Sequence, residues 1–269
     1  MSVSNHRLDR EVDVEVSLSG RVAVVTGASS GIGLGIVKQF LECGVAGIVA
    51  VFRRATDPPP LRELQERFGE KVRIVRGNVG DEETARAYAS EALEYFGRID
   101  VLICNAAVSV VKAIHEHTSE EWDDVFNSNV KAVYWASRYV IPAMRRQGGG
   151  LILISGSISG EAGIPTQGAY GPSKGALHQM TRQMAVEYAK DHIRVNAIAC
   201  GTVDTPIVHA SAAASGDPDA YWEMLKRNHP IGRIANVEEV ASFFAYMASD
   251  RATFFTGSVL MMDGGYTAQ

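Results

Sequence analysis

Short apolar runs rich in β-branched residues alternate with longer segments of helical periodicity along this chain. The runs are Val22–Thr26, Ile48–Phe52, Val72–Arg76, Val101–Asn105, Leu151–Ser155, Arg194–Ala199 and Val259–Met262. Most of them are continuously apolar, as a strand must be when both of its faces are buried. Strand–helix alternation implies right-handed crossovers. The sequence therefore predicts an α/β fold, a doubly wound and mostly parallel sheet of about seven strands with helices on both faces.

Helices are expected between these runs, and their ends carry recognisable signals. The expected segments are Gly33–Cys43, Leu61–Phe68, Glu82–Phe96, Ser119–Arg146, Tyr170–Lys190, Tyr221–Arg227 and Val237–Ala248. Thr118–Glu121 has the pattern of a capping box, and three glycines at 148–150 end the long helix. Ala210–Gly216 is the one long stretch expected to be irregular. A loop of that kind often covers a site, so we predict a substrate lid at about 206–232.

Length and composition restrict the classes of protein that remain. The 269 residues fit one large domain, expected at 18–269, after an N-terminal extension at 1–17 that we expect to be flexible. The net charge of −5, without a lysine/arginine block, gives no electrostatic basis for binding nucleic acid. Apolar runs stay shorter than the roughly 18 residues of a membrane span. Three widely spaced cysteines predict neither disulfides nor zinc, and a cytoplasmic location is the simplest expectation.

The first strand leads into a glycine-rich turn, Thr26–Gly33, with the sequence TGASSGIG. Parallel sheets bind ligands at the carboxyl ends of their strands. Glycines allow a tight turn and a close approach to a pyrophosphate, and the following helix directs its unpaired N–H groups and positive dipole end at the phosphates. We therefore expect a dinucleotide to contact Gly27, Ser29, Ser30, Gly31, Ile32 and Gly33.

The same residues permit a different interpretation. Gly27–Gly31 also matches G-x-S-x-G, the nucleophile elbow of serine hydrolases, which would make Ser29 a nucleophile. Its place on the first strand weakens that alternative, and the downstream strand ends show no obvious Asp-then-His pair. A second alternative is a nucleotide-binding protein without catalytic activity.

Two arginines follow the second predicted strand and bear on the choice of cofactor. Dinucleotide enzymes recognise the ribose here, with an acidic residue for a 2′-hydroxyl or an arginine for a 2′-phosphate. Arg53 and Arg54 directly follow Phe52, and no carboxylate occurs before Asp57. We therefore prefer NADP(H) and keep NAD(H) as possible; the competing interpretation is two solvated arginines on a loop.

Tyr170 and Lys174 stand four residues apart at the start of an expected helix, so their side chains share one face. A free tyrosine has a pKa near 10, and a neighbouring ammonium is expected to lower that pKa. Such a pair can act as general acid or base on a hydroxyl. Taken alone, the Tyr-x-x-x-Lys spacing is a weak signal, because such pairs are common on exposed helices.

Several motifs occur in a characteristic order over about residue 18 to the C-terminus. They are TGxxxGxG at Thr26–Gly33, an NAG-type segment at Asn105–Ala107, Asn129 in the long helix, Ser157 placed 13 residues before Tyr170, Cys200–Thr205 in place of PG-x-x-x-T, and a closing DGG at Asp263–Gly265. In these motifs the chain resembles the short-chain dehydrogenase/reductase family, in its single-domain form of about 250 residues.

The resemblance implies a Rossmann fold and an oxidoreductase that moves a hydride between nicotinamide and the carbon of a secondary alcohol or ketone. Tyr170 would exchange a proton with the reacting oxygen, and Ser157 would hydrogen-bond that oxygen. Lys174 would hold the nicotinamide ribose and depress the tyrosine pKa, while Asn129 would hold a water that links Lys174 to bulk solvent.

The resemblance also implies the remaining contacts and the assembly. Besides the glycine turn and the arginines, the cofactor would contact Asn78, Val79, Asn105, Ala106, Ala107, Tyr170, Lys174, Gly201, Val203 and Thr205. The partner would be a small-molecule alcohol or carbonyl substrate, in a homotetramer. We expect no metal, because His115 and His117 lack a third ligand.

The chain departs from the family pattern at three positions. Asn78 stands where the family often has an aspartate at the adenine, and it can still donate and accept hydrogen bonds. Ala107 replaces a glycine, which puts the local backbone path in question. Cys200 replaces a proline beside the nicotinamide, and there we expect a buried, unreactive thiol.

Overall fold

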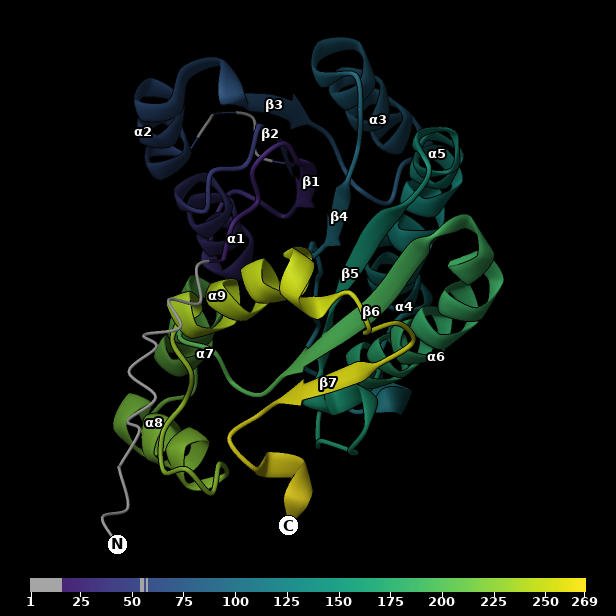
Figure 1. The fold of residues 1–269 in the computed structure, drawn as a ribbon. Coiled ribbons are helices and arrows are strands. Elements are labelled where there is room, and N and C mark those ends of the chain that lie inside the picture. Colours follow the sequence, from purple (N-terminus) through teal and green to yellow (C-terminus); the bar gives the residue numbers. More distant parts are fainter. Residues whose placement is uncertain (1–15, 54–55, 57) are drawn as a thin grey trace, which may run out of the picture.

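The computed structural model describes residues 16–53, 56 and 58–269, so most of the predicted N-terminal extension lies outside it. Its sheet (Figure 1) has the order β3-β2-β1-β4-β5-β6-β7, with every neighbouring pair parallel. The strands are β1 Val22–Thr26, β2 Gly47–Phe52, β3 Val72–Arg76, β4 Val101–Cys104, β5 Gly150–Ser157, β6 Ile193–Cys200 and β7 Val259–Met262. The predicted doubly wound parallel sheet is confirmed.

Helices pack on both faces of the sheet (Figure 1). On one face lie α1 Gly31–Glu42, α2 Pro59–Phe68 and α9 Val237–Ala248, and their apolar residues share one core cluster with β1 and β2. On the other face α3 Glu82–Phe96, α5 Ala132–Gln147 and α6 Tyr170–Tyr188 form a second cluster with β4, β5 and β6. The central strands are therefore buried on both sides, as their continuously apolar sequences require.

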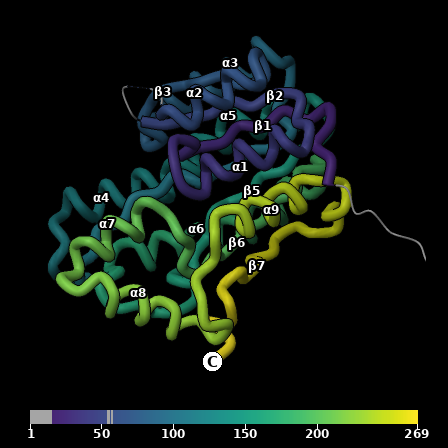
Figure 2. The backbone as a smooth tube through the Cα atoms, turned by 90° about the vertical axis from the view of Figure 1, so that its left-hand side faces the viewer, coloured from purple at the N-terminus to yellow at the C-terminus, as the bar shows by residue number. Residues whose placement is uncertain are grey.

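The remaining helices lie beyond the carboxyl ends of the strands. They are α4 Ser119–Phe126 after β4, and α7 Pro206–Ala214 with α8 Pro218–Arg227 after β6. Figure 2 shows all three at the same side of the molecule. This end of the sheet is where a doubly wound fold binds its ligand.

The predicted lid region differs from its predicted structure. Ala210–Gly216 was expected to be irregular, but residues 206–214 form α7. Pro206 occupies the first turn, where its missing N–H costs nothing, and alanine has the highest helix propensity. Prediction from the small residues alone underestimated this propensity.

The long helix expected at Ser119–Arg146 is interrupted. A π-helical turn, Asn127–Lys131, separates α4 from α5. The predicted ends of this region are confirmed, since Thr118 and Glu121 form a reciprocal capping box and Gly148 ends α5 in a left-handed conformation. Single-turn π segments often occur at functional positions, and this one contains Asn129.

Every helix in the described part of the chain is too short or too polar to span a bilayer. Among the same residues, His, Cys, Asp and Glu side chains form no group of three or more that could hold a metal ion.

The core makes a stability prediction. Phe244 on α9 is fully buried, whereas Phe254 in the segment before β7 is fully exposed. Phe244→Ala should lower the free energy of unfolding by about 3–5 kcal/mol, because it removes buried apolar area and leaves a cavity. Phe254→Ala is the matched control and should change it by less than about 0.5 kcal/mol. Urea denaturation followed by circular dichroism measures both, and equal losses would contradict the described packing.

Candidate active site

The glycine turn after β1 is fastened to the end of β4 by hydrogen bonds. The Thr26 hydroxyl donates to the Ile103 carbonyl at 3.1 Å and accepts from the backbone N–H groups of Asn105 and Ala106, at 2.9 and 3.1 Å. The Asn105 amide donates to the Thr26 carbonyl at 3.0 Å. Asn105 therefore fixes the turn, a role that the motif alone did not reveal.

The turn forms a cradle that fits a pyrophosphate. Gly27 has φ +69°, and a Cβ on Gly33 would lie 2.2 Å from the Gly27 carbonyl oxygen, so only glycine can occupy position 33. Ser30 is the N-cap of α1, but its side chain makes no capping hydrogen bond, and the first turn of α1 holds no acidic residue. Its N–H groups are thus available to an anion. The predicted set Gly27, Ser29, Ser30, Gly31, Ile32 and Gly33 lies together in this turn.

The residues predicted for the adenosine end lie at the neighbouring strand ends. Exposed Arg53 directly follows β2, and Arg54 lies outside the described residues. Asn78 and Val79 follow β3, which pairs with β2 through Phe52 and Arg76. The Asn78 side chain accepts from the backbone N–H of Gly80 at 3.3 Å. Because parallel strands end at one edge, these residues belong to the same edge as the glycine turn.

The residues predicted for the nicotinamide end lie in the loop after β6, which approaches the glycine turn at Thr205. Gly201 donates its backbone N–H to Met262 at 3.0 Å, and Val203 pairs with Ala235 in an isolated bridge. A Cβ on Gly31 would lie 3.4 Å from the Thr205 side chain, so this loop approaches the glycine turn. Ala107 has no positive φ, so its backbone conformation does not require glycine, and its contact with the cofactor stays a prediction.

The predicted proton-transfer residues converge on the end of β5. Ser157 is the last residue of β5, and Tyr170 opens α6. The Lys174 ammonium lies 5.4 Å from the centroid of the Tyr170 ring and donates to the Ser155 carbonyl at 2.7 Å. One turn of α6 thus places tyrosine and lysine on the same face, beside the serine, as the spacing predicted.

The electrostatics of this site differ from the prediction. Burial raises the pKa of the Tyr170 phenol to about 12, against an opposing interaction with Ser157. The expected lowering of this pKa by the ammonium is therefore wrong for the described structure. Burial also lowers the pKa of Lys174 to about 8, because a low-dielectric environment disfavours its charge. Burial raises the pKa of the Cys200 thiol to about 12, so this cysteine is a neutral thiol.

Asn129 is buried and all its side-chain contacts are within the protein. Its amide oxygen accepts from the Val108 N–H at 2.8 Å, and its amide nitrogen donates to the Val108 carbonyl and to the Ser173 hydroxyl, each at 3.0 Å. Ser173 donates in turn to the Tyr170 carbonyl at 2.7 Å. Asn129 thus connects the loop after β4 to the first turn of α6, and its predicted role in holding a water stays a prediction.

His117 is a residue whose place at the site the sequence did not show. Its Nε2 accepts the backbone N–H of Ala169 at 3.2 Å, directly before Tyr170. A nitrogen that accepts carries no proton, so Nδ1 holds it. The Nδ1 atom of His117 is buried without a hydrogen-bond partner among the described residues, and the Oε2 atom of Glu121 lies 4.0 Å from it. The sequence showed only two nearby histidines, because the contact to Ala169 spans 52 residues.

Comparison with known proteins agrees with this geometry. A family model described as enoyl-(acyl carrier protein) reductase matches residues 27–267. The cis-4-hydroxycyclohexanecarboxylate dehydrogenase of Sinomonas cyclohexanicum is 37% identical over 92% of this chain and 97% of that protein. The chain belongs to the short-chain dehydrogenase/reductase family. Members of this family are oxidoreductases, and the chain is an NAD(P)-dependent enzyme that acts on CH–OH groups.

Two further proteins similar to this short-chain dehydrogenase/reductase are described together with their cofactor. The NADP-dependent (R)-specific alcohol dehydrogenase of Lentilactobacillus kefiri is 34% identical over 94% of this chain and 98% of that protein. The L-sorbose reductase of Gluconobacter frateurii, solved with NADPH and L-sorbose, superposes with a TM-score of 0.90 at 35% identity, over 95% of this chain and 99% of that one. Family membership also removes the ground for the serine-hydrolase alternative at Ser29.

The contact of His117 yields a prediction about catalysis. His117→Phe keeps an aromatic ring but removes the acceptor for Ala169, so the first turn of α6 loses a constraint. We expect kcat to fall about tenfold, the equivalent of one lost hydrogen bond, with cofactor affinity little changed. His117→Gln, whose amide oxygen can occupy the position of Nε2, should recover most of the rate. Steady-state kinetics and a fluorescence titration with cofactor test this, and equal losses in both variants would refute it.

Proposed function

We propose that this enzyme is an NADP(H)-dependent oxidoreductase that interconverts secondary alcohols and ketones, with Tyr170 as general acid and base. The observation that carries the proposal is the convergence of Ser157, Tyr170 and Lys174 at the carboxyl edge, beside a turn that fits a pyrophosphate. Bound nicotinamide would supply the hydride, and the protein supplies orientation and the proton.

Each of the three side chains has a distinct part. Tyr170, a neutral phenol because burial raises its pKa, donates a proton to the developing alkoxide during reduction. Ser157 hydrogen-bonds the same oxygen and holds it within reach of the phenol. Lys174 presents an ammonium beside the ring and, where it is protonated, stabilises the phenolate that remains.

Asn129 and Ser173 support this arrangement through hydrogen bonds. Their hydrogen bonds fix the Tyr170 carbonyl relative to the loop after β4. In the reverse direction, Tyr170 first loses its proton, and the phenolate then takes the proton of the alcohol. Lys174 and a water held near Asn129 would carry the released proton to solvent. That relay belongs to the proposal.

Arg53 supports the preference for NADP(H). Its exposed guanidinium stands at the strand end where dinucleotide enzymes recognise the ribose, and a 2′-phosphate would accept charge-assisted hydrogen bonds from it. A relative and a structural neighbour both carry NADP in their names. NAD(H) is the alternative cofactor.

α7 and α8 serve as the substrate lid in this proposal. His209 on α7 contacts Asp204 at 2.6 Å, and its ring lies 5.0 Å from the ring of Trp222 on α8. The ring contact joins the two helices. His229 accepts the Thr202 N–H at 3.0 Å and fastens the end of α8 to the loop after β6. Relatives that act on hydroxycyclohexanecarboxylate and sorbose support a medium-sized, partly polar substrate.

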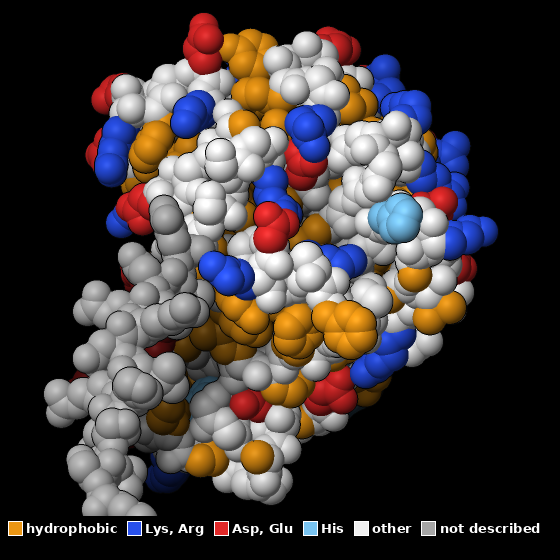
Figure 3. Space-filling model, viewed as in Figure 1, with side chains coloured by type: hydrophobic (Ala, Val, Ile, Leu, Met, Phe, Trp, Pro, Cys, Tyr) orange, Lys and Arg blue, Asp and Glu red, His pale blue; other side chains and the backbone are white. Residues whose placement is uncertain are grey.

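A homotetramer in the cytoplasm completes the proposal. Hydrophobic side chains gather beside α9 (Figure 3), and Met261 on β7 is exposed. Val186 on α6 and Tyr134 on α5 are also exposed, on the opposite face of the sheet. Apolar groups on two faces are what an assembly with two kinds of interface would bury.

The pKa of Tyr170 makes a prediction about pH. Oxidation requires the phenol to lose its proton, so kcat/KM for a secondary alcohol should rise by up to about tenfold per unit between about pH 6 and 8. Reduction uses the protonated phenol, so kcat/KM for a ketone should not rise over this range.

The substitution Tyr170→Phe should abolish both oxidation and reduction and leave cofactor affinity within a few-fold. Near-normal turnover by the Phe variant would end the assignment.

Arg53 makes a prediction about cofactor choice. Arg53→Ala should weaken NADPH binding by about tenfold, the loss of a charge-assisted hydrogen bond, and NADH binding much less. The matched control is Arg62→Ala, which removes an equal charge from the exposed side of α2. Fluorescence titration with both cofactors measures this, and equal losses for NADPH and NADH would remove the preference.

A further inference from the structure

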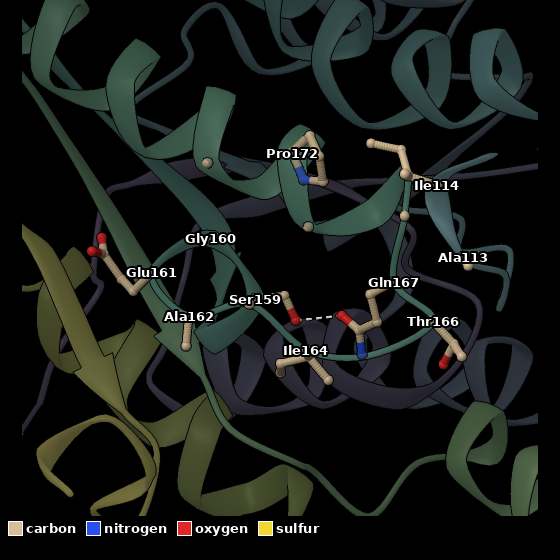
Figure 4. A pocket seen from close by; sticks show the side chains of 14 residues that line it. Ala113, Ile114, Ser159, Gly160, Glu161, Ala162, Ile164, Thr166, Gln167 and Pro172 are labelled. Atoms are coloured by element: carbon tan, nitrogen blue, oxygen red, sulfur yellow. Dashed lines mark hydrogen bonds between the residues drawn. The ribbon is translucent and has the colours of Figure 1, made fainter.

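A cavity of about 520 Å³ opens next to the first turn of α6. Figure 4 shows it between the segment after β5, the loop after β4 and the start of α6. Most of its walls are apolar or glycine, and the apolar side chains are Ala113, Ile114, Ala162, Ile164 and Pro172. The few polar side chains that face this cavity would decide which polar groups of a bound molecule it accepts.

Of the four polar side chains that line the cavity, two are engaged elsewhere. Glu161 contacts His178 at 2.9 Å and Arg182 at 3.7 Å, and in Figure 4 its carboxylate points away from the other labelled groups. The Thr166 hydroxyl donates to the neighbouring carbonyl of Pro165 at 2.6 Å. Ser159 and Gln167 remain, and their side chains point toward each other (Figure 4).

Ser159 and Gln167 are linked to the reacting centre through Ser157. The Ser157 hydroxyl donates to the Ser159 hydroxyl at 3.2 Å, and the Ser159 hydroxyl donates to the amide oxygen of Gln167. Ser159 also donates its backbone N–H to the Ser157 hydroxyl at 3.1 Å. Gln167 is thus two hydrogen bonds away from the serine that would hold the reacting oxygen.

The Gln167 side chain retains hydrogen-bonding capacity toward the cavity. Among the described residues its amide nitrogen has no hydrogen-bond acceptor, while its backbone is held by Gly171 at 2.9 Å and by a bridge to Lys112. A fixed backbone with a free amide group is preorganised for a ligand. A hydroxyl both donates and accepts, so it can pair with either end of the amide.

We propose that Ser159 and Gln167 form a second oxygen subsite next to the reacting carbon, so that the enzyme selects α-hydroxy ketones and vicinal diols over ketones and alcohols with a single oxygen. This inference rests on the proposed function, because it takes the position of the reacting oxygen from Ser157. A substrate without the second oxygen forgoes the hydrogen bond to the amide, and sites built to hydrogen-bond a substrate hydroxyl discriminate against such analogues.

Matched substrate pairs test the proposal. The pairs are 2-butanone with 3-hydroxy-2-butanone, and cyclohexanone with 2-hydroxycyclohexanone, each reduced by the full-length enzyme with NADPH. The wild type should favour the hydroxy ketone by at least about tenfold in kcat/KM. In Gln167→Met and in Ser159→Ala this ratio should fall toward one. The ratio is taken within one enzyme, so a general loss of activity does not affect it.

Gln183→Met is the matched control, because Gln183 lies on the exposed side of α6 and bonds only to Glu187 among the described residues. It should keep the wild-type ratio. A wild type without preference, or a Gln167→Met variant that keeps the preference, overturns the subsite while ketone reduction stands. If the wild type reduces no ketone with NADPH or NADH, the proposed function fails, and the subsite fails with it.

Discussion

One polar network joins the glycine turn after β1 to Lys174, and the geometry of the candidate site depends on it. Asn105 donates to the Thr26 carbonyl and accepts from the Ser155 hydroxyl at 3.1 Å, while the Ser155 carbonyl receives the Lys174 ammonium. Three strand ends, those of β1, β4 and β5, are thereby tied to α6. Hydrogen bonds in a low-dielectric interior are strong when every partner is satisfied, so the network fixes the relative position of cofactor turn and proton donor.

The network also explains why a charged lysine can occupy a buried position. Burial lowers the pKa of Lys174, which means that its ammonium is destabilised relative to water. The Ser155 carbonyl and the nearby Tyr170 ring offset part of this cost. The same burial keeps Tyr170 protonated. Burial therefore keeps the phenol a neutral acid, while the polar partners of Lys174 favour its charged form beside that acid.

The loop after β4 also restrains Tyr170, through contacts with residues before it and with Asn129. Val108 meets Asn129, Lys112 pairs with Gln167, and His117 accepts from Ala169. These contacts position the residues before and within the first turn of α6. The same loop contributes Ala113 and Ile114 to the cavity, so it links the shape of the cavity to the orientation of the tyrosine. In the proposed enzyme, substrate choice and proton transfer share this structural support.

The sequence determined the strands and their parallel arrangement, and its motifs predicted Ser157, Tyr170 and Lys174 as the residues of proton transfer. Continuous apolar runs, a glycine turn and fixed spacings are local signals, and local signals survive without coordinates. Residues such as Ala210–Gly216 were misassigned because composition suggested a loop where alanine propensity gave a helix. Asn129 was found by its motif, but not the π-helical turn that contains it.

Only the tertiary structure decided the direction of the Tyr170 pKa shift, the hydrogen bonds by which Asn105 joins β1 to β4 and β5, and the contacts that His117, Ser159 and Gln167 make. The pKa depends on how much protein surrounds the phenol, and burial is a sum over residues distant in sequence. The contact of His117 with Ala169 and that of Asn105 with Thr26 likewise cross long separations. Spacing along a chain fixes neighbours on one helix, whereas packing of separate elements sets the environment in which those neighbours react.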